Sequence, residues 1–402
     1  MDKNSVLTLK GFRDITPEQK YVRDVVEQTL VNQFKKYNFV GLETPTLEYQ
    51  SLLLGKYGSE ADKLVYKFKD NGDRDVALRY DQTVPTARYI LNNFNNIPKY
   101  FRRYQIQNVF RSEKPQKGRY REFKQCDIDI YGSNSPIADA EILSCVYSSF
   151  IALNINNIVI KINDRNLLVN TIQSIVNNSI NVFSVIQSID KLDKLTTEDV
   201  IKELEAKGLS KQLSLKVINE LKNLKIPDSL NNIIDAAVNL GVNKNSIQFD
   251  PYLARGLDYY TGFIFEVKIK NSNLGSLGGG GRYNNLINQL VGKKVPATGF
   301  AFGFDRIVEY LDNKTKAQNN SYLVATFNDS SLNYSLNIAT KLRKLNSNVE
   351  IYPQSTDKLT NQIKYAISNN FRYLVIAGQQ EMEKNEYIIK DLLNKEQKTI
   401  KV

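Results

Sequence analysis

One long hairpin constrains the fold of this chain more than any other segment. Its sequence, residues 99–132, is KYFRRYQIQNVFRSEKPQKGRYREFKQCDIDIYG, in which the turn-forming EKPQKGR separates two strand-like halves. In the second half, a period of two places Cys126, Ile128 and Ile130 on one apolar face. The opposite face carries a polar row formed by Arg121, Phe123, Gln125, Asp127 and Asp129. The pattern predicts a strand with one face on a core and the polar row open to a partner or to solvent.

The polar row has the length and chemistry to hold an elongated ligand. It spans eight strand steps, roughly 26 Å at about 3.3 Å per residue. On the first strand Gln107, Val109 and Arg111 share a face, so Arg111 could stand over the row. Arginine binds phosphate oxygens through two parallel hydrogen bonds, and a planar ring such as adenine could stack on Phe123. An ordinary surface hairpin remains the alternative interpretation.

Composition narrows the possible chemistry. The 402 residues contain no histidine and only two cysteines, which excludes Ser–His–Asp and Cys–His nucleophilic sites, a histidine base and a four-cysteine zinc site. The net charge of +11 suits an anionic partner, although a merely basic protein is an equal alternative. No apolar run reaches the length of a membrane span, so we expect a cytoplasmic protein without a membrane partner. Chemistry must then depend on carboxylates, Arg, Lys, Tyr, backbone groups or a carboxylate-bound metal.

The chain length favours two or three domains, and the pattern changes along the chain agree. A helix is expected from Pro17, with Thr16 as its cap and an end near Asn38. Strand-forming segments follow over 63–131, and an inserted helical domain over 164–245. After a polar linker, alternating strands and helices predict a small α/β domain that ends in a β-hairpin. The predicted domains are 1–163 with 246–318, 164–245, and 322–402.

Three further segments carry candidate functional residues. In LRYDQTVPTARY, Arg79, Asp81 and Thr83 alternate onto one face of a predicted strand, where Asp81 and Thr83 could hold an ammonium group; a solvated strand end is the alternative. ARGLDYYTGFIFEV places Arg255 in a loop before a strand, and the four glycines that follow at 278–281 allow close backbone approach, although such a run is usually a turn. GFAFGFDRI predicts a strand that passes into a helix near Arg306.

Together these segments resemble the histidyl-tRNA synthetase family of class II aminoacyl-tRNA synthetases. FRSEKPQKGRYREF is similar to the second class II signature, GFAFGFDRI to the third, and GLETPTLEY around Pro45 to the first, dimer-forming signature. ARGLDYYTG resembles the histidine-specific loop of the family, and LRYDQT and QCDID match its substrate strands. The resemblance implies an α+β fold: a catalytic domain on an antiparallel sheet, a helical insertion and a C-terminal α/β anticodon-binding domain.

The resemblance also implies a role for individual residues. For histidine these are Asp81, Thr83 and Gln125 at the α-amino group, Asp129 and Tyr260 at the imidazole nitrogens, and Tyr259 and Tyr283 along the pocket. For ATP they are Arg111 and Arg255 as the catalytic cations at the α-phosphate, Glu113 and Phe123 at adenine, and Arg121 and Arg306 at the outer phosphates. No metal-ligating residue is assigned.

The implied activity is histidine–tRNA ligation: ATP and Mg²⁺ activate L-histidine as an adenylate, and the histidyl group passes to the 3′ end of tRNA(His). The implied assembly is a homodimer. One alternative is the catalytically inactive, synthetase-like regulatory subunit of ATP phosphoribosyltransferase, which would be expected to lose the histidine-specific loop and the anticodon domain. Another is a class II synthetase for a different amino acid, against which Asp129 and Tyr260 argue.

Overall fold

The computed structural model describes residues 6–55, 62–115, 118–176, 180–255, 260–272, 274–292, 294–312 and 321–402. The chain divides into two compact units, residues 1–315 and residues 316–402. Each unit has its own sheet and its own hydrophobic core.

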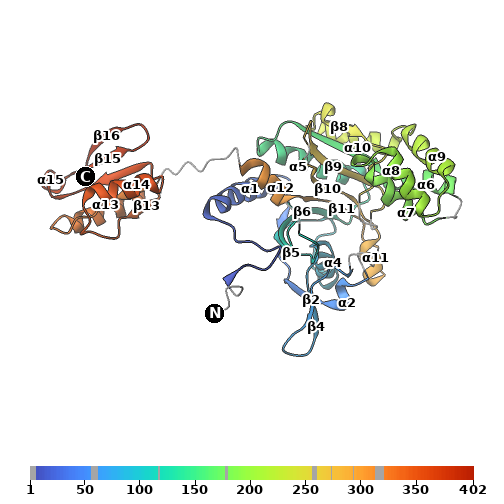
Figure 1. Ribbon diagram of the computed structural model, residues 1–402, viewed down its shortest axis with the longest axis horizontal. Helices are drawn as coiled ribbons and strands as arrows, with labels where there is room; N and C mark the ends of the chain where they lie inside the picture. The colour runs from blue at the N-terminus through green and yellow to red at the C-terminus, as the bar shows by residue number, and fades with distance from the viewer. Residues whose placement is uncertain are drawn as a thin grey trace. The chain divides into compact units, whose positions relative to one another are not determined.

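An eight-stranded sheet forms the centre of the first unit (Figure 1). Neighbouring strands are antiparallel except at the two edges, where β1 pairs with β5 and β7 with β8 in parallel. In spatial order the strands are β1 Val40–Gly41, β5 Phe101–Phe110, β6 Glu122–Tyr131, β11 Ala297–Phe302, β10 Ser276–Arg282, β9 Phe263–Ile269, β7 Ile158–Asp164 and β8 Ile247–Phe249. The hairpin predicted from residues 99–132 is therefore β5 and β6, near one edge of this sheet.

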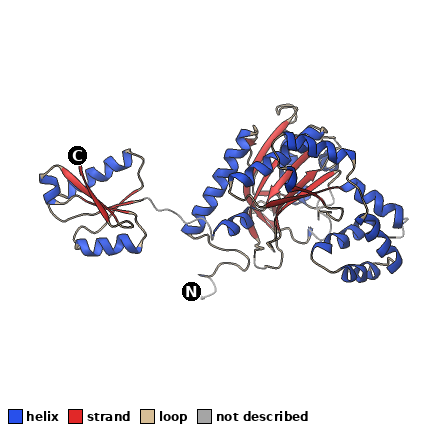
Figure 2. Cartoon of the chain, turned by 90° about the horizontal axis from the view of Figure 1, so that it is seen from above, coloured by secondary structure: helices blue, strands red, loops and turns tan. Residues whose placement is uncertain are grey.

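Helices pack against the apolar face of the sheet (Figure 2). They are α1 Pro17–Lys36, α5 Pro136–Ala152, α10 Asp228–Asn239 and α12 Phe304–Asp312. Their apolar side chains form one core with Cys126, Ile128 and Ile130, as the period of two predicts. The first helix also agrees with its sequence, because Thr16 Oγ1 accepts from the backbone N–H of Gln19 at 3.4 Å.

A three-stranded sheet lies beside the hairpin. Its strands are β2 Leu47–Tyr49, β4 Asp75–Leu78 and β3 Lys67–Lys69, and it is followed by the helix α4 Thr83–Asn92. The prediction that Arg79, Asp81 and Thr83 share one face of a strand is wrong, because the strand ends at Leu78. The carboxylate of Asp81 instead accepts from the backbone N–H of Val84 at 3.2 Å, which satisfies a donor in the first turn of α4.

A group of helices follows β7 and has a core of its own. These elements are α6 Arg165–Val176, α7 Val182–Ile189, the 3₁₀ turn η2 Asp190–Asp193, α8 Thr197–Ala206 and α9 Lys211–Lys222. We call residues 165–222 the helical segment. Tyr252 and Ala254, which precede β9, pack into its core. The next helix, α10, packs against α5 instead.

The second unit has the predicted α/β pattern. Strands β13 Val349–Ile351, β12 Tyr322–Val324 and β14 Tyr373–Ile376 are parallel, and the hairpin of β15 Glu386–Asp391 and β16 Glu396–Lys401 extends the sheet. The helices α13 Leu332–Lys344, α14 Leu359–Ser368 and α15 Gln379–Glu383 alternate with the strands. None of the helices in the described ranges of the chain has the length and apolar character needed to cross a membrane.

Candidate active site

The register of β5 and β6 determines which side chains stand beside the polar row. Arg103 lies opposite Asp129, and Gln107 lies opposite Gln125. On the other side of β6, Gly299 of β11 lies opposite Asp129, and a Cβ atom at Gly299 would lie 1.9 Å from the Asp129 carboxylate. The absence of a side chain at Gly299 therefore leaves the space that this carboxylate occupies.

A buried charge cluster forms one end of the row. The fully buried guanidinium of Arg103 lies 2.7 Å from a carboxylate oxygen of Asp129 and 4.0 Å from one of Asp127. The hydroxyl of Tyr283 donates to Asp129 and lies 3.0 Å from the hydroxyl of Tyr131. Burial raises the pKa of Asp129, and Arg103 and Tyr283 oppose that rise. Burial raises the pKa of Asp127 to about 8, despite the attraction of Arg103.

Four buried acceptor oxygens near this cluster have no hydrogen-bond donor among the described residues. They are Oε1 of Gln82, Oε1 of Gln125, Oδ1 of Asp127 and Oδ2 of Asp129, the last of which is ion-paired with Arg103 although the Arg103 nitrogens also form no hydrogen bond within the described part of the chain. Gln125 uses its amide nitrogen to donate to Asp127 at 2.8 Å, so its oxygen remains available. Buried acceptors without donors cost free energy until a ligand supplies N–H or O–H groups. This end of the row therefore suits a ligand rich in N–H donors.

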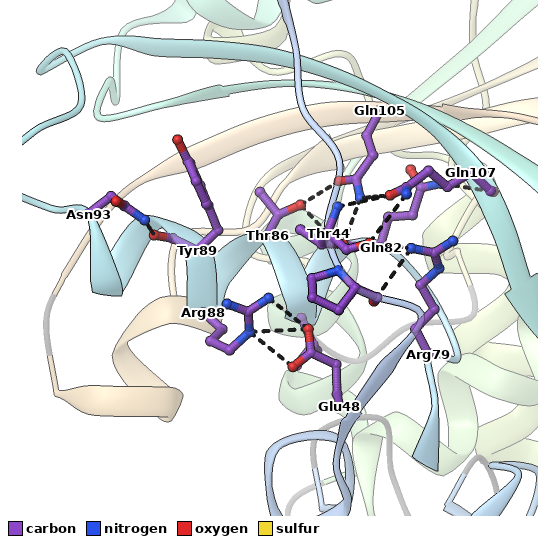
Figure 3. Close-up of polar contacts among 12 residues, drawn as sticks. Thr44, Glu48, Arg79, Gln82, Thr86, Arg88, Tyr89, Asn93, Gln105 and Gln107 are labelled. Carbon is purple, nitrogen blue, oxygen red and sulfur yellow. Dashed lines mark hydrogen bonds and ion pairs between the residues drawn. The ribbon is translucent and has the colours of Figure 1, made fainter. Parts of the chain in front are cut away.

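A hydrogen-bond network attaches the row to the segment around Pro45 (Figure 3). Gln105 donates to the hydroxyl of Thr44 at 2.8 Å, and Gln107 donates to the carbonyl oxygen of Thr44 at 3.2 Å. Gln82 donates to the carbonyl oxygens of Gln107 and Gln125, each at 3.0 Å. These contacts hold α4, β5 and β6 together beneath the candidate site.

Cations and aromatic rings occupy the other end of the row. The guanidinium of Arg111 lies 4.3 Å from the ring centre of Tyr80 and 5.1 Å from that of Phe123. Arg121 donates to the carbonyl oxygen of Glu113 at 3.0 Å, and the carboxylate of Glu113 lies 3.2 Å from Arg119. Arg111, Glu113, Arg121 and Phe123 are thus near one another, as the sequence predicts for one binding region.

Arg255 and Arg306 line a cavity of about 470 Å³ between the sheet and the helical segment. Arg255 lies against Gly279 of β10, where a Cβ atom would be 2.1 Å from the guanidinium carbon. The carboxylate of Glu266 lies 3.7 Å from Arg255, and Arg306 donates to the carbonyl oxygen of Ser276 at 2.7 Å. Burial and the neighbouring arginines lower the pKa of Arg306. Among the described residues, five basic and four acidic side chains line the cavity, and Arg255 and Arg306 are the arginines among them that could bind phosphate groups.

Comparisons with known proteins agree with this arrangement. A family model described as histidyl-tRNA synthetase matches residues 11–307, and one described as an anticodon-binding domain matches residues 321–402. The chain belongs to the histidyl-tRNA synthetase family. This family uses ATP as a substrate, and its fold is the α+β arrangement expected from the sequence.

Individual relatives cover almost the whole chain. A histidine–tRNA ligase of Cytophaga hutchinsonii is 36% identical over 96% of this chain and 96% of its own length. One of Borreliella afzelii is 35% identical over 98% of this chain and 94% of its own length. The crystal structure of histidyl-tRNA synthetase from Nostoc sp. PCC 7120 has a TM-score of 0.83 and 28% identity, and the match covers 98% of this chain and 97% of that one. The family assignment predicted from the sequence motifs, and with it the histidine–tRNA ligase activity, is confirmed.

The regulatory-subunit alternative gains no comparable support. A structure from Bacillus halodurans C, titled as an ATP phosphoribosyltransferase regulatory subunit/histidyl-tRNA synthetase, has a TM-score of 0.75 but only 19% identity, which shows a shared fold. The curated relatives at 34–36% identity are instead named histidine–tRNA ligase.

The remaining residues predicted from the sequence to bind histidine are positioned as follows. Asp81, Thr83 and Tyr260 are buried, and Tyr260 belongs to the same apolar cluster as Tyr131 and Tyr283. Tyr259 lies outside the described residues. The structure thus brings Asp129 and Tyr283 into contact.

Three residues without a role assigned from the sequence lie beside the candidate site residues. The guanidinium of Arg103 is ion-paired with Asp129, and it also contacts the carboxylate of Asp127. The carboxylate of Glu266 lies beside the guanidinium of Arg255. Extending the period of two along the first strand from Arg111 would have reached Arg103. The position of Glu266 depends on the pairing of β9 with β10, which no local motif indicates.

Proposed function

We propose that this chain forms histidyl-adenylate along the polar row and the adjoining cavity, and then charges tRNA(His). The imidazole and ammonium groups of histidine bind at the end that contains Asp129, and the phosphates of ATP bind among Arg111, Arg255 and Arg306. One observation carries the proposal: buried acceptors without donors lie at the end of β6 where Arg103 is ion-paired with Asp129, and Arg111 lies over Phe123 at the other end.

The residues at the histidine end offer hydrogen-bonding groups that are complementary to the ammonium and imidazole groups of histidine. The unpartnered oxygens of Gln125 and Asp127 suit the ammonium N–H groups, together with Asp81 and Thr83 near the start of α4. Asp129, oriented by Arg103 and Tyr283, suits one imidazole nitrogen, with Tyr260 as the candidate for the other. A site that pairs both imidazole nitrogens rejects amino acids that lack them.

The reaction needs alignment and positive charge. A carboxylate oxygen of histidine forms a bond to the α-phosphorus, and the bond from that phosphorus to the β-phosphate bridge breaks, so that pyrophosphate leaves. Arg111 and Arg255 stabilise the charge on the α-phosphoryl oxygens in the transition state. Phe123 stacks on adenine, with Glu113 at its edge, and Arg121 and Arg306 hold the outer phosphates.

Mg²⁺ fits the residues present, although the described part of the chain has no group of three acidic, cysteine or histidine ligands. Mg²⁺ is usually held by one or two carboxylates together with substrate phosphates. Glu266 lies among the cations proposed for the phosphates and would supply a carboxylate ligand. The bound ion would neutralise phosphate charge.

A homodimer is supported by an apolar surface next to the Pro45 segment. Leu47, Tyr49 and Phe68 are exposed by 43%, 60% and 44%. Tyr49 and Phe68 pair with Val76 from opposite sides, so all three share one face of the small sheet. An apolar surface of this kind is typical of a protein interface. The network of Figure 3 would connect such an interface to the polar row.

Three parts of the chain would have separate roles in the reaction. Residues 1–163 with 246–318 would form the adenylate, 322–402 would bind the anticodon region of tRNA(His), and 164–245 would be a helical insertion whose last helix, α10, packs on α5 of the first part. The match of residues 321–402 to an anticodon-binding domain supports the second assignment. Because its substrate is tRNA, we also assign the enzyme to the cytoplasm.

The test is ATP–pyrophosphate exchange with each of the standard amino acids in turn. We expect exchange with histidine alone, and a loss of about 10²–10³-fold in Arg255→Ala, the usual cost of one transition-state charge contact. Lys270→Ala, at the end of β9 and exposed, is the matched control and should retain activity. Exchange with another amino acid, or full activity in Arg255→Ala, would refute the assignment.

A further inference from the structure

Arg255 has an unusual backbone conformation. Its φ is 58°, in the left-handed region that long side chains rarely adopt. Such strain persists only where surrounding groups hold the backbone, and it concentrates at functional sites. The contacts of the preceding residue, Ala254, therefore bear on how Arg255 is held.

Both peptide polar groups of Ala254 bond to the helical segment. Its N–H donates to Oδ1 of Asp190 at 3.3 Å, and its carbonyl oxygen accepts from Nη1 of Arg165 at 2.8 Å. Arg165 begins α6 and Asp190 begins η2. Ala254 itself is only 1% exposed and packs into the core of the helical segment. Two hydrogen bonds from the helical segment therefore hold the backbone of Ala254, the residue before Arg255.

A second set of contacts reaches Arg255 from the same helices. Asp193 of η2 lies 3.1 Å from Lys268, which lies 3.0 Å from Glu266. Glu266 in turn lies 3.7 Å from Arg255. The backbone before Arg255 and the carboxylate beside its guanidinium are therefore both connected to η2.

The environment of Asp190 argues for a specific contact. Its carboxylate lines the cavity that Arg255 and Arg306 share. Burial raises the pKa of Asp190, whereas the hydrogen bond from Ala254 and the charge of Arg255 lower it. A half-buried carboxylate that bonds to a distant loop would be costly without these partners.

We propose that Asp190 is a positioning residue for adenylation: it fixes the Ala254 peptide and so keeps Arg255 in its strained conformation against Gly279. The proposal rests on the proposed function, because it assumes that Arg255 acts at the α-phosphate. It gives the helical segment a role in the first step of the reaction, before any contact with tRNA.

The experiment is a double-mutant cycle on the full chain. Single-turnover histidyl-adenylate formation is measured for Asp190→Ala in the wild-type background and in the Arg255→Ala background. We expect Asp190→Ala alone to lower the rate about 10- to 100-fold, since small misplacements of catalytic groups cost this much. The KM for histidine should stay within about twofold of wild type because the hydrogen bond of Asp190 in the described part of the chain goes to Ala254 and not to a residue proposed for histidine. In the Arg255→Ala background, Asp190→Ala should cost nothing further, because the group through which it acts is gone.

Two comparisons guard against a merely structural effect. Asp190→Asn retains an oxygen that can accept from Ala254, so its loss should be smaller than that of Asp190→Ala. Asp235→Ala makes the same substitution at an exposed position of α10 and should leave the rate unchanged. If Asp190→Ala does not fold, Asp190→Leu fills the volume without an acceptor and enters the same cycle.

The outcomes separate the two hypotheses. An equal loss from Asp190→Ala in both backgrounds, or no loss in either, overturns the positioning role. Wild-type protein without histidine-dependent adenylate formation overturns the proposed function instead.

Discussion

Arg103→Met gives the sharpest test of the buried charge cluster. Arg103 is fully buried, and its guanidinium contacts the buried carboxylates of Asp127 and Asp129. Methionine has a similar length but no charge, so the substitution leaves these carboxylates without their cation. Removing one partner of a buried ion pair typically costs about 3–5 kcal/mol of unfolding free energy.

The expected change in melting temperature follows from the size of the unit. An unfolding entropy of about 2.1 cal/mol/K per residue gives a shift of about 1.5 °C per kcal/mol for a unit of 315 residues. Arg103→Met should therefore lower Tm by about 5–8 °C. The adjacent Arg102 forms a surface pair with Glu141, whose side chains are 27% and 24% exposed. Such pairs contribute at most about 1 kcal/mol, so Arg102→Met should shift Tm by no more than about 2 °C.

Differential scanning calorimetry of both variants supplies the measurement. Arg103→Met combined with Asp129→Asn should regain part of the loss, because a neutral amide replaces the carboxylate that lost its cation. A shift in Arg103→Met no larger than that of Arg102→Met would show that the cluster contributes little, and would refute the reasoning.

Four further predictions follow from the same structure. Asp129→Asn and Tyr260→Phe should raise the KM for histidine at least tenfold but that for ATP less than twofold; equal rises would indicate only a folding role. The pKa of Asp127 is raised from 3.8 to about 8, so between these values the folded state retains a proton that the unfolded state releases. The free energy of unfolding should therefore fall as the pH rises from about 4 to 8, and Asp127→Asn should reduce that pH dependence in melting experiments. Phe68→Glu should shift sedimentation from dimer towards monomer, whereas Lys69→Glu on the same strand should not. Removing residues 316–402 should spare adenylate formation but abolish tRNA charging; full charging would contradict the role of the second unit.

Alternation along the hairpin predicted the parts of the site that lie on β6. A period of two assigns side chains to faces without knowledge of neighbouring strands, so the core face and the polar row could be read directly. The pairing of Arg103 with Asp129 requires the register of β5 against β6, which the loop length leaves open. The charge cluster could therefore not be predicted from the pattern of one strand alone.

Local patterns failed where tertiary contacts override them. LRYDQTV resembles a strand, but α4 begins at Thr83, and the carboxylate of Asp81 accepts from the N–H of Val84 in its first turn. The glycine run 278–281 suggests a turn, yet it forms the interior of β10. Gly279 is explained only by Arg255, a residue that is distant in sequence and lies against it.

We propose that the distribution of acceptor oxygens and arginines along the polar row would orient histidine for reaction. At one end, side-chain oxygens of Gln82, Gln125 and Asp127 have no donor among the described residues, and the cation there, Arg103, is fully buried and ion-paired with Asp129 although its nitrogens form no hydrogen bond. A substrate carboxylate at that end would face oxygens and leave them without donors. At the other end, about 20 Å or six strand steps from Asp129, Arg111 lies over Phe123. Histidine bound in the proposed way, by its N–H groups, would direct its carboxylate towards the arginines and the phosphates. The carboxylate of the substrate histidine is already ionised at neutral pH, so attack on the α-phosphorus needs no general base. A protein that contains no histidine residue can therefore perform this step.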